Sequence, residues 1–286
     1  IPPTLYPLAF RTSTAFNITV VFPVPGLPVI NNNRFFNNLF LLLNRSLIFP
    51  KMVCSQQGRV GLQTRKLGRT NLEVSVIGFG AMWLPELKVE ECVKVVRRAI
   101  ELGINYFDTA RNYGDSEEKL GLALQDLRDK CVIATKTGSK TRKEALQEVE
   151  KSLDALKTDR IDILQLHGID DSKTLKKAMS ADGALETCKE ACSEGLVDFI
   201  GISSHRPNIL IEAIRTGEFD MVLVPLNVVT RQPIEEFLPL AKENDIGVAV
   251  MKPLAMKVAN ILTWRYSPPF SLLSDEPELA TFLGSD

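Results

Sequence analysis

The stretch NYFDTARNYG, residues 105–114, decides how the rest of the chain is interpreted. It runs from an apolar segment with the character of a β-strand straight into Asp108, and Tyr113 follows five residues later. A strand that ends on a carboxylate places a polar group at the edge of a sheet. Other strands of the same sheet are then expected to end on polar groups that can meet it.

Two later apolar runs end in this way. CVIATK, residues 131–136, ends on Lys136, and IDILQLH, residues 161–167, ends on His167. In a β/α barrel the carboxyl ends of the strands open onto one face, where such enzymes keep their active sites. We therefore expect these side chains to converge with Asp108 at one rim, and Tyr113 to join them from its loop.

From residue 66 onward, short runs rich in β-branched residues alternate with longer amphipathic segments. In VEECVKVVRRAIELG the apolar residues recur at helical spacing, at Val89, Val93, Val96 and Ile100. Such alternation predicts an α/β fold with a parallel sheet, and apolar residues on both strand faces fit a sheet that is covered on both sides. Seven strands are predicted, at 73–80, 104–108, 131–136, 161–167, 197–203, 221–227 and 247–253.

The four polar side chains form a chemically coherent set. A tyrosine with its ordinary pKa of about 10 is a poor proton donor at neutral pH. A lysine ammonium beside it favours the phenolate, and a carboxylate paired with the lysine holds the cation in place. A neutral histidine can hydrogen-bond the same substrate oxygen. Tyr113, Lys136, Asp108 and His167 are therefore predicted to protonate an oxygen that gains negative charge, as a carbonyl oxygen does when hydride reaches its carbon.

Each of these residues also has an ordinary structural interpretation. Asp108 could cap a turn, and Tyr113 could be an amphipathic rim residue. Lys136 could keep a strand edge soluble, and His167 could be a hydrogen-bonded core histidine. Three of the four fall at equivalent points of consecutive units, which favours a shared site over four coincidences.

Composition limits the partners of the chain. Its 286 residues include 34 basic and 35 acidic side chains, for a net charge of −1. This balance gives no electrostatic footprint for nucleic acid or for an acidic membrane surface. The five cysteines are odd in number and lack C-x-x-C spacing, so neither a disulfide framework nor a metal site is predicted. We expect a reducing compartment, the cytoplasm, and the sequence leaves the oligomeric state open.

Residues 1–60 differ from the barrel region at 61–286. The first 50 residues contain seven prolines, and no acidic residue precedes Glu73. We expect a non-native or unstructured leader that packs little against the barrel, with Met52 as a plausible start. An acid-poor organellar transit peptide is one alternative. A membrane anchor is another, although the apolar run at 35–49 is too short and too interrupted to span a bilayer.

Several long motifs resemble those of the aldo-keto reductase family, in the family's order, over roughly residues 65–255. They are RKLGRTNLEVSVIGFGAMW (65–83), GINYFDTARNYGDSEEKLG (103–121), VIATKTG (132–138), DRIDILQLHGID (159–170) and VDFIGISSHRP (197–207). The resemblance implies a (β/α)8 barrel of the TIM type, opened by a small hairpin. It also implies reduction of aldehydes and ketones with NADPH (NADP in its oxidised form).

The resemblance also assigns residues to roles. It places the family's catalytic tetrad on Asp108, Tyr113, Lys136 and His167, and it places Trp83 in the substrate pocket. The residues implied to bind the cofactor lie in the loops after three strands: Gly80, Ala81, Met82, Ser203, Ser204, Lys252, Pro253 and Leu254.

The chain also departs from the family pattern. Leu223 stands in strand six where many relatives have a glutamine, and Ser204 stands where many have an asparagine. No eighth strand is recognisable near residue 280, so we expect an incomplete barrel without the basic residues that hold the adenosine 2′-phosphate. C-terminal truncation is the favoured explanation. The alternative is that the N-terminal region fills the gap.

The sequence thus favours an NAD(P)H-dependent oxidoreductase that acts on a small carbonyl substrate. Two other functions stay open. One is a barrel that kept the tetrad but lost its affinity for the cofactor and acts as a binding protein. The other is a Schiff-base lyase with Lys136 as the nucleophile.

Overall fold

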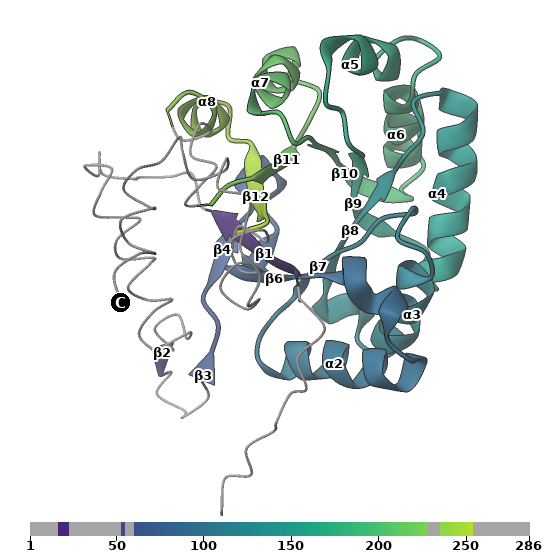
Figure 1. The fold of residues 1–286 in the computed structure, drawn as a ribbon, viewed down its shortest axis with the longest axis vertical. Helices are drawn as coiled ribbons and strands as arrows, with labels where there is room; N and C mark the ends of the chain where they lie inside the picture. Colours follow the sequence, from purple (N-terminus) through teal and green to yellow (C-terminus); the bar gives the residue numbers. More distant parts are fainter. Residues whose placement is uncertain (1–16, 23–52, 55–59, 228–234, 254–286) are drawn as a thin grey trace, which may run out of the picture.

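Seven parallel strands form most of the wall of a barrel (Figure 1). The computed structural model describes residues 17–22, 53–54, 60–227 and 235–253, and at 17–22, 53–54 and 60–61 it describes the backbone alone. The predicted parallel sheet is confirmed. In order around the barrel, its strands are β6 (Ile77–Gly80), β7 (Tyr106–Asp108), β8 (Val132–Thr137), β9 (Ile161–Leu166), β10 (Val197–Ser203), β11 (Met221–Pro225) and β12 (Gly247–Met251).

The gap between β12 and β6 is filled by β1 (Asn17–Phe22), which closes the barrel. This strand is antiparallel to both neighbours, with Asn17 opposite Gly80 and Val20 opposite Val250. Because strands at an open edge present unpaired N–H and C=O groups, an extended segment within reach can satisfy them.

The expectation that the leader packs little against the barrel therefore does not hold for the six residues of β1. For this segment the structure agrees with the alternative, in which the N-terminal region fills the gap. No eighth parallel strand occurs among the described residues, and the neighbourhood of residue 280 lies outside them. Most of the remaining leader also lies outside them, apart from the short pair β2 (Val53–Cys54) and β3 (Val60–Gly61).

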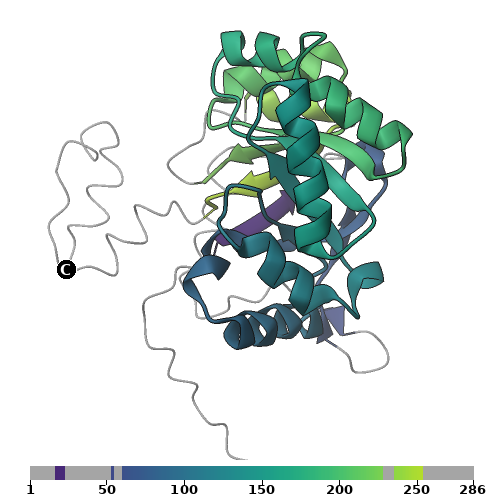
Figure 2. The same cartoon turned by 90° about the vertical axis from the view of Figure 1, so that its right-hand side faces the viewer.

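Helices lie outside the strands in both views (Figure 1 and Figure 2). Their bounds are α2 (Val89–Glu101), α3 (Ser116–Leu124), α4 (Arg142–Leu156), α5 (Ser172–Ala178), α6 (Ala184–Ser193), α7 (Pro207–Thr216) and α8 (Phe237–Glu243). On α2 the predicted apolar face is largely right: Val96 is buried and Ile100 packs against the core, whereas Val89 in the first turn is exposed. No helix in the described ranges has the length and apolar character needed to cross a membrane.

Side chains alternate between the barrel interior and the surrounding helices. On β8, Ala134 belongs to the interior cluster and Ile133 to the larger cluster beneath the helices. On β11, Leu223 points inward and Val222 outward in the same way. This period of two means that residues two apart on one strand share the interior. Polar side chains near the carboxyl ends of the strands therefore lie next to the apolar cluster inside the barrel.

A hairpin closes the end of the barrel that lies opposite the carboxyl ends of the parallel strands. Its strands β4 (Thr64–Lys66) and β5 (Glu73–Ser75) are antiparallel, and Leu67 and Val74 insert fully buried into the interior cluster. Gly68 is required in the turn because its φ is +51° and an added Cβ would lie 2.3 Å from the Gly247 nitrogen. The hairpin implied by the family resemblance is therefore present, and it leaves the other end open for the site.

Candidate active site

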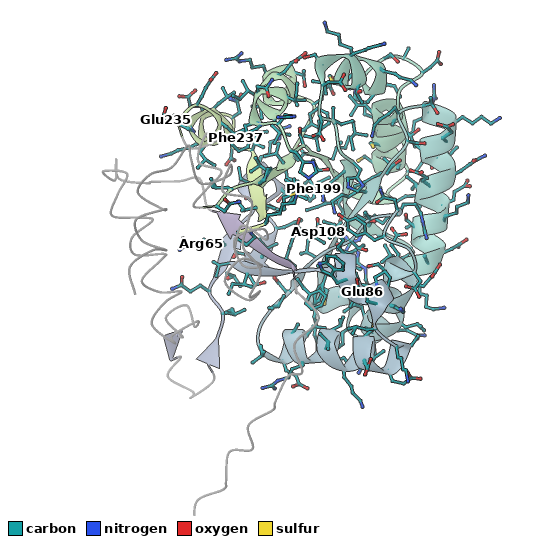
Figure 3. The ribbon with its side chains drawn as sticks, in the orientation of Figure 1. Arg65, Glu86, Asp108, Phe199, Glu235 and Phe237 are labelled. Carbon is teal, nitrogen blue, oxygen red and sulfur yellow. The ribbon has the colours of Figure 1, made fainter. Side chains whose placement is uncertain are left out.

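Lys136 lies at the centre of the site. It is on β8 and 1% exposed, and its ammonium donates hydrogen bonds of 2.6 Å each to Asp108 Oδ1 and to the carbonyl of Thr109. Asp108 is the last residue of β7, inside the molecule (Figure 3). Burying an ammonium is costly unless it is paired and hydrogen-bonded. These two contacts meet that cost and fix the position of the cation.

The rings of Tyr113 and His167 complete the cluster. Lys136 Nζ lies 5.1 Å from the centroid of the Tyr113 ring, within cation–π range. The Tyr113 and His167 ring centroids are 5.7 Å apart, with the ring planes at 82°. The four side chains thus converge, as the strand-end argument predicts.

Backbone hydrogen bonds place Tyr113 over the lysine. After β7 the chain stays along β8, because Thr109 N–H donates to the Ala134 carbonyl and Arg111 N–H donates to the Lys136 carbonyl. A turn follows in which Tyr113 N–H donates to the Ala110 carbonyl. The loop therefore follows the neighbouring strand for several residues and then turns the phenol back over the strand ends.

A buried carboxylate, that of Glu117, holds the loop between β7 and α3 in place. Glu117, on α3, is fully buried and pairs with Arg111 at 2.5 Å. It also accepts a hydrogen bond from Thr135 of β8. Burial raises the pKa of Glu117, and hydrogen bonds from Thr135 and Ser152 oppose that rise. These contacts tie the loop between β7 and α3 to the back of β8.

Burial also shifts the acidity of the two rings. It raises the pKa of Tyr113 above its usual value, while Lys136 lowers that pKa and Asp108 raises it. The lysine thus acts in the predicted direction, but burial outweighs it. Burial, helped by the charges of Lys136 and Lys140, lowers the pKa of His167 to about 3. The imidazole is therefore neutral near pH 7, and the phenol keeps its proton.

The residues predicted to bind the cofactor after strand one lie beside this cluster. Gly80 ends β6 opposite Asp108, and the turn η2 (Ala81–Glu86) begins directly after it. The Ala81 carbonyl accepts a hydrogen bond from Ser116 Oγ at 2.8 Å, which fixes the start of the turn. Trp83 is partly buried in η2, next to Met82, and its Nε1 is buried without a partner among the described residues.

The serines predicted to bind the cofactor lie at the end of β10, and both hydroxyls have protein partners. Ser203 Oγ accepts a hydrogen bond from the Gly168 N–H at 3.0 Å. Ser204 is fully buried, and its Oγ donates to Asp170 Oδ1 at 2.9 Å. The side chain that replaces the family's asparagine is therefore held by the loop after β9.

The predicted residues after β12 are described in part. Lys252 is exposed, has a φ of +57°, and its carbonyl accepts a hydrogen bond from Asn227 Nδ2 at 3.1 Å. Pro253 is half-buried, and Leu254 lies outside the described residues. The contact from Asn227 joins the ends of β11 and β12 at the rim.

Three polar residues near the site were not predicted. Gln165 donates to Asp108 Oδ2, Lys140 Nζ donates to the His167 carbonyl, and Asn227 holds the Lys252 carbonyl. Gln165 could have been found from the sequence, because it lies two residues before His167 and so shares the same strand face. Lys140 and Asn227 lie in loops, where the sequence carries no comparable signal.

The described part of the chain holds no cluster of three or more His, Cys, Asp or Glu residues that could bind a metal ion. The polar groups at the rim are instead a cation, a phenol, an imidazole and hydroxyls. Such a set suits an organic ligand with oxygen and nitrogen acceptors.

The fold places the chain among the β/α-barrel proteins, and the polar side chains described above lie at the carboxyl ends of its strands. The sequence model of the Aldo/keto reductase family matches residues 76–268 of this chain. The chain belongs to this family. The resemblance in the motifs is thereby confirmed.

Relatives from bacteria and a plant cover much of the chain. The uncharacterised oxidoreductase YqkF of Bacillus subtilis is 36% identical over 210 residues, which are 68% of this chain and 65% of that protein. L-galactose dehydrogenase of Arabidopsis thaliana is 31% identical over 239 residues, 77% of this chain and 73% of that protein. The solved holo form of aldo-keto reductase AKR11C1 from Bacillus halodurans superposes with a TM-score of 0.59 at 31% identity and covers 65% of each chain. The chain thus spans slightly less than two thirds of the length of the first and third of these proteins.

Proposed function

We propose that the chain is an NADPH-dependent reductase that converts an aldehyde or ketone to an alcohol, with Tyr113 as the proton donor. The observation that carries this proposal is the buried Lys136–Asp108 pair beneath the Tyr113 ring, with a neutral His167 edge-on to that ring. Membership of the aldo/keto reductase family supports the same chemistry.

The proposed mechanism assigns one task to each side chain. A reduced nicotinamide, when bound, supplies hydride to the carbonyl carbon. Tyr113 Oη gives its proton to the carbonyl oxygen as the second carbon–oxygen bond breaks, so the product is an alcohol and the phenol becomes a phenolate. The Lys136 ammonium stabilises that phenolate, and Asp108 holds the ammonium. His167, being neutral, donates a hydrogen bond that orients the substrate oxygen.

Two buried polar atoms support a bound ligand at the rim. Trp83 Nε1 and His167 Nδ1 are buried polar atoms without a partner in the described part of the chain, and such atoms call for a ligand or water. The proposed cofactor contacts come from the last residues of β6 and β10 and from the segments after β6, β10 and β12: Gly80, Ala81, Met82, Ser203, Ser204, Lys252 and Pro253. Trp83 would line the substrate pocket.

The geometry separates the proposed reductase from one of the two alternative functions. A Schiff-base lyase needs Lys136 as a neutral nucleophile, whereas the Asp108 carboxylate at 2.6 Å stabilises its ammonium form. A barrel that kept the tetrad but lost its cofactor affinity would contain the same buried Lys136–Asp108 pair. Titration with NADPH separates that alternative from the reductase.

A labelling experiment tests the proposed function. The protein is mixed with NADPH deuterated at the transferred position and with a panel of small aldehydes and ketones, and the product alcohols are analysed by mass spectrometry. We expect one deuterium on the carbinol carbon. With Tyr113→Phe we expect the rate to fall by at least about 10²-fold, the lower range for general acid catalysis, while fluorescence titration shows that NADPH still binds.

Parallel arms separate the alternatives. NADH replaces NADPH in one arm, and borohydride with an aldehyde substrate but no cofactor is used in another. An absence of NADPH binding in the titration would support the binding protein that lost its cofactor affinity, and borohydride trapping on Lys136 would support the lyase. Binding of NADPH without deuterium transfer to any substrate of the panel would count against the proposed reductase. Near-normal turnover of Tyr113→Phe would remove Tyr113 from the mechanism.

A further inference from the structure

Gln165 is a fully buried amide inside the barrel, next to the ion pair. It lies on β9, with Lys136 of β8 on one side and Gly201 of β10 on the other in the strand register. Its Nε2 donates a hydrogen bond of 3.1 Å to Asp108 Oδ2. The two oxygens of the Asp108 carboxylate thus have different partners, Lys136 on Oδ1 and Gln165 on Oδ2.

We infer that Gln165 is a positioning residue for the proton donor: its amide holds the Asp108 carboxylate so that Oδ1 faces Lys136, and it thereby controls the charge around the Tyr113 phenol. This inference rests on the proposed function, because it names the residue that orients the proposed catalytic pair. Gln165 acts through Asp108, to which its amide donates.

The orientation of the amide follows from its partner. A carboxylate only accepts hydrogen bonds, so the amide must present its NH₂ group and not its carbonyl oxygen. Gln165 Oε1 is then left buried without a partner among the described residues. An unsatisfied buried acceptor destabilises a fold. A hydrophobic residue of the same size would avoid that loss, so the glutamine is better explained by what it does to Asp108.

Gly201 leaves the space that this amide occupies. A Cβ at Gly201 would lie 2.8 Å from Gln165 Cγ and 2.9 Å from Met221 Sδ. Real Cβ atoms do not come this close to their neighbours, so an alanine at this position would displace the glutamine or the methionine. The glycine and the glutamine therefore act together on adjacent strands.

The charges that face Tyr113 determine whether removal of the Gln165 amide raises or lowers the pKa of Tyr113. Without the amide, the Asp108 charge loses one compensating donor and the carboxylate is free to rotate away from Lys136. A less compensated anion and a less well placed cation both disfavour the phenolate, so the pKa of Tyr113 should rise. The titratable groups that act on the two rings are Asp108 from β7, Lys136 from β8, and Lys140, Asp170 and His205 from the loops around His167. Tyr106 of β7 is buried beside Asp108.

The test measures this pKa directly by carbon-13 NMR of ring-labelled tyrosine. The chain has four tyrosines, and Tyr113→Phe identifies the signal that titrates with the site. In Gln165→Met, which keeps the length of the side chain and removes the donor, we expect the pKa of Tyr113 to rise by about half a pH unit or more, as loss of part of one charged hydrogen bond predicts.

Thr187→Val is the matched control. Thr187 is also fully buried, on α6, and its Oγ1 donates at 2.7 Å to the Arg142 carbonyl on the helical side of the sheet. It therefore loses a buried hydrogen bond without touching the ion pair, and the pKa of Tyr113 should stay at its parent value. If Gln165→Met does not fold, Gln165→Leu, which also removes the donor, takes its place and should also raise the pKa.

An unchanged or lowered pKa in the folded Gln165 variant would overturn the inference. An equal rise in Thr187→Val would overturn it as well, because the effect would then follow lost stability. The titration needs neither cofactor nor turnover. Failure of deuterium transfer therefore counts against the proposed function alone, and failure of the titration counts against the role of Gln165 alone.

Discussion

At the scale of single residues, burial decides the charge of His167. Its Nδ1 is buried without a partner in the described part of the chain, and cations lie nearby at Lys136 and Lys140. Desolvation comes first, and repulsion from these cations adds to it, so the pKa falls from 6.5 to about 3. Protonating the His167 ring therefore lowers the free energy of unfolding.

This shift predicts how stability depends on pH. The unfolded chain binds a proton on His167 more readily than the folded chain does, so the contribution of this residue is fully present above a pH of about 6.5 and is lost as the pH falls from there toward 3. His167→Gln, which carries no titrating ring, should lose less stability over this interval. Urea midpoints at pH 7 and pH 5 measure the difference.

Thr187→Val is the control for that measurement. It removes a fully buried hydroxyl that does not titrate in this range. This change should leave the acid-induced loss close to that of the parent. If the parent and His167→Gln lose equal stability between the two pH values, the neutral and buried state of His167 is contradicted.

At the scale of elements, the hairpin of β4 and β5 acts as a plug. Leu67 is fully buried against the interior cluster, and the turn beyond it is fastened by Arg69, which pairs with Asp220 at 2.9 Å and hydrogen-bonds the Asp245 carbonyl through its N–H. Because Leu67 lies among strands on several sides, little of the cavity left by its removal can collapse.

We predict that Leu67→Ala lowers the free energy of unfolding by about 2–5 kcal/mol, the usual range for a buried leucine. Leu122→Ala on α3, whose side chain is 38% exposed, should change it by less than about 1 kcal/mol. Chemical unfolding of both variants measures the contrast. Similar small losses in the two variants would show that the hairpin is not a structural plug.

At the scale of the whole molecule, closure of the barrel depends on β1. Its residues hydrogen-bond to β6 on one side and to β12 on the other, and Val20 is paired with both strands, opposite Ile77 and Val250. A proline at such a position removes a ladder hydrogen bond and is confined in natural sheets to edges and bulges.

We therefore predict that Val20→Pro lowers the melting temperature by about 5 °C or more, since a loss of roughly 3 kcal/mol shifts a domain of this size by about 2–4 °C per kcal/mol. The aggregation rate should rise as well, because the edges of β6 and β12 are then exposed. Deleting residues 1–16, which keeps β1, is the comparison. A melting temperature of Val20→Pro within about 2 °C of the parent would favour the original expectation of a leader that packs little.

The seven parallel strands and the convergence of Asp108, Lys136 and His167 could be predicted from the sequence because both rest on local patterns. A strand is marked by a short β-branched run, and the last residue of that run is placed at the rim by the direction of a parallel sheet. The location of Tyr113 followed because its loop is short. No distant contact was needed for any of these predictions.

Other features depend on contacts between distant segments. The rise in the pKa of Tyr113 depends on how much protein covers the phenol, and a list of neighbouring charges does not give that. The hydrogen bond from Gln165 to Asp108 joins residues 57 positions apart. The closure of the barrel pairs Asn17–Phe22 with β6 and β12, which lie far along the chain. This pairing uses backbone groups, which are the same in most residue types, so the sequence does not signal it.

The sequence by itself therefore determined the family, the parallel strands and the polar groups at their ends, because those features follow from the order of residues along the chain. Only the tertiary structure decided which strand closes the barrel, which amide holds Asp108 and how burial sets the protonation of Tyr113 and His167. The physical reason is that desolvation and pairing depend on three-dimensional surroundings, to which segments far apart in the chain contribute together.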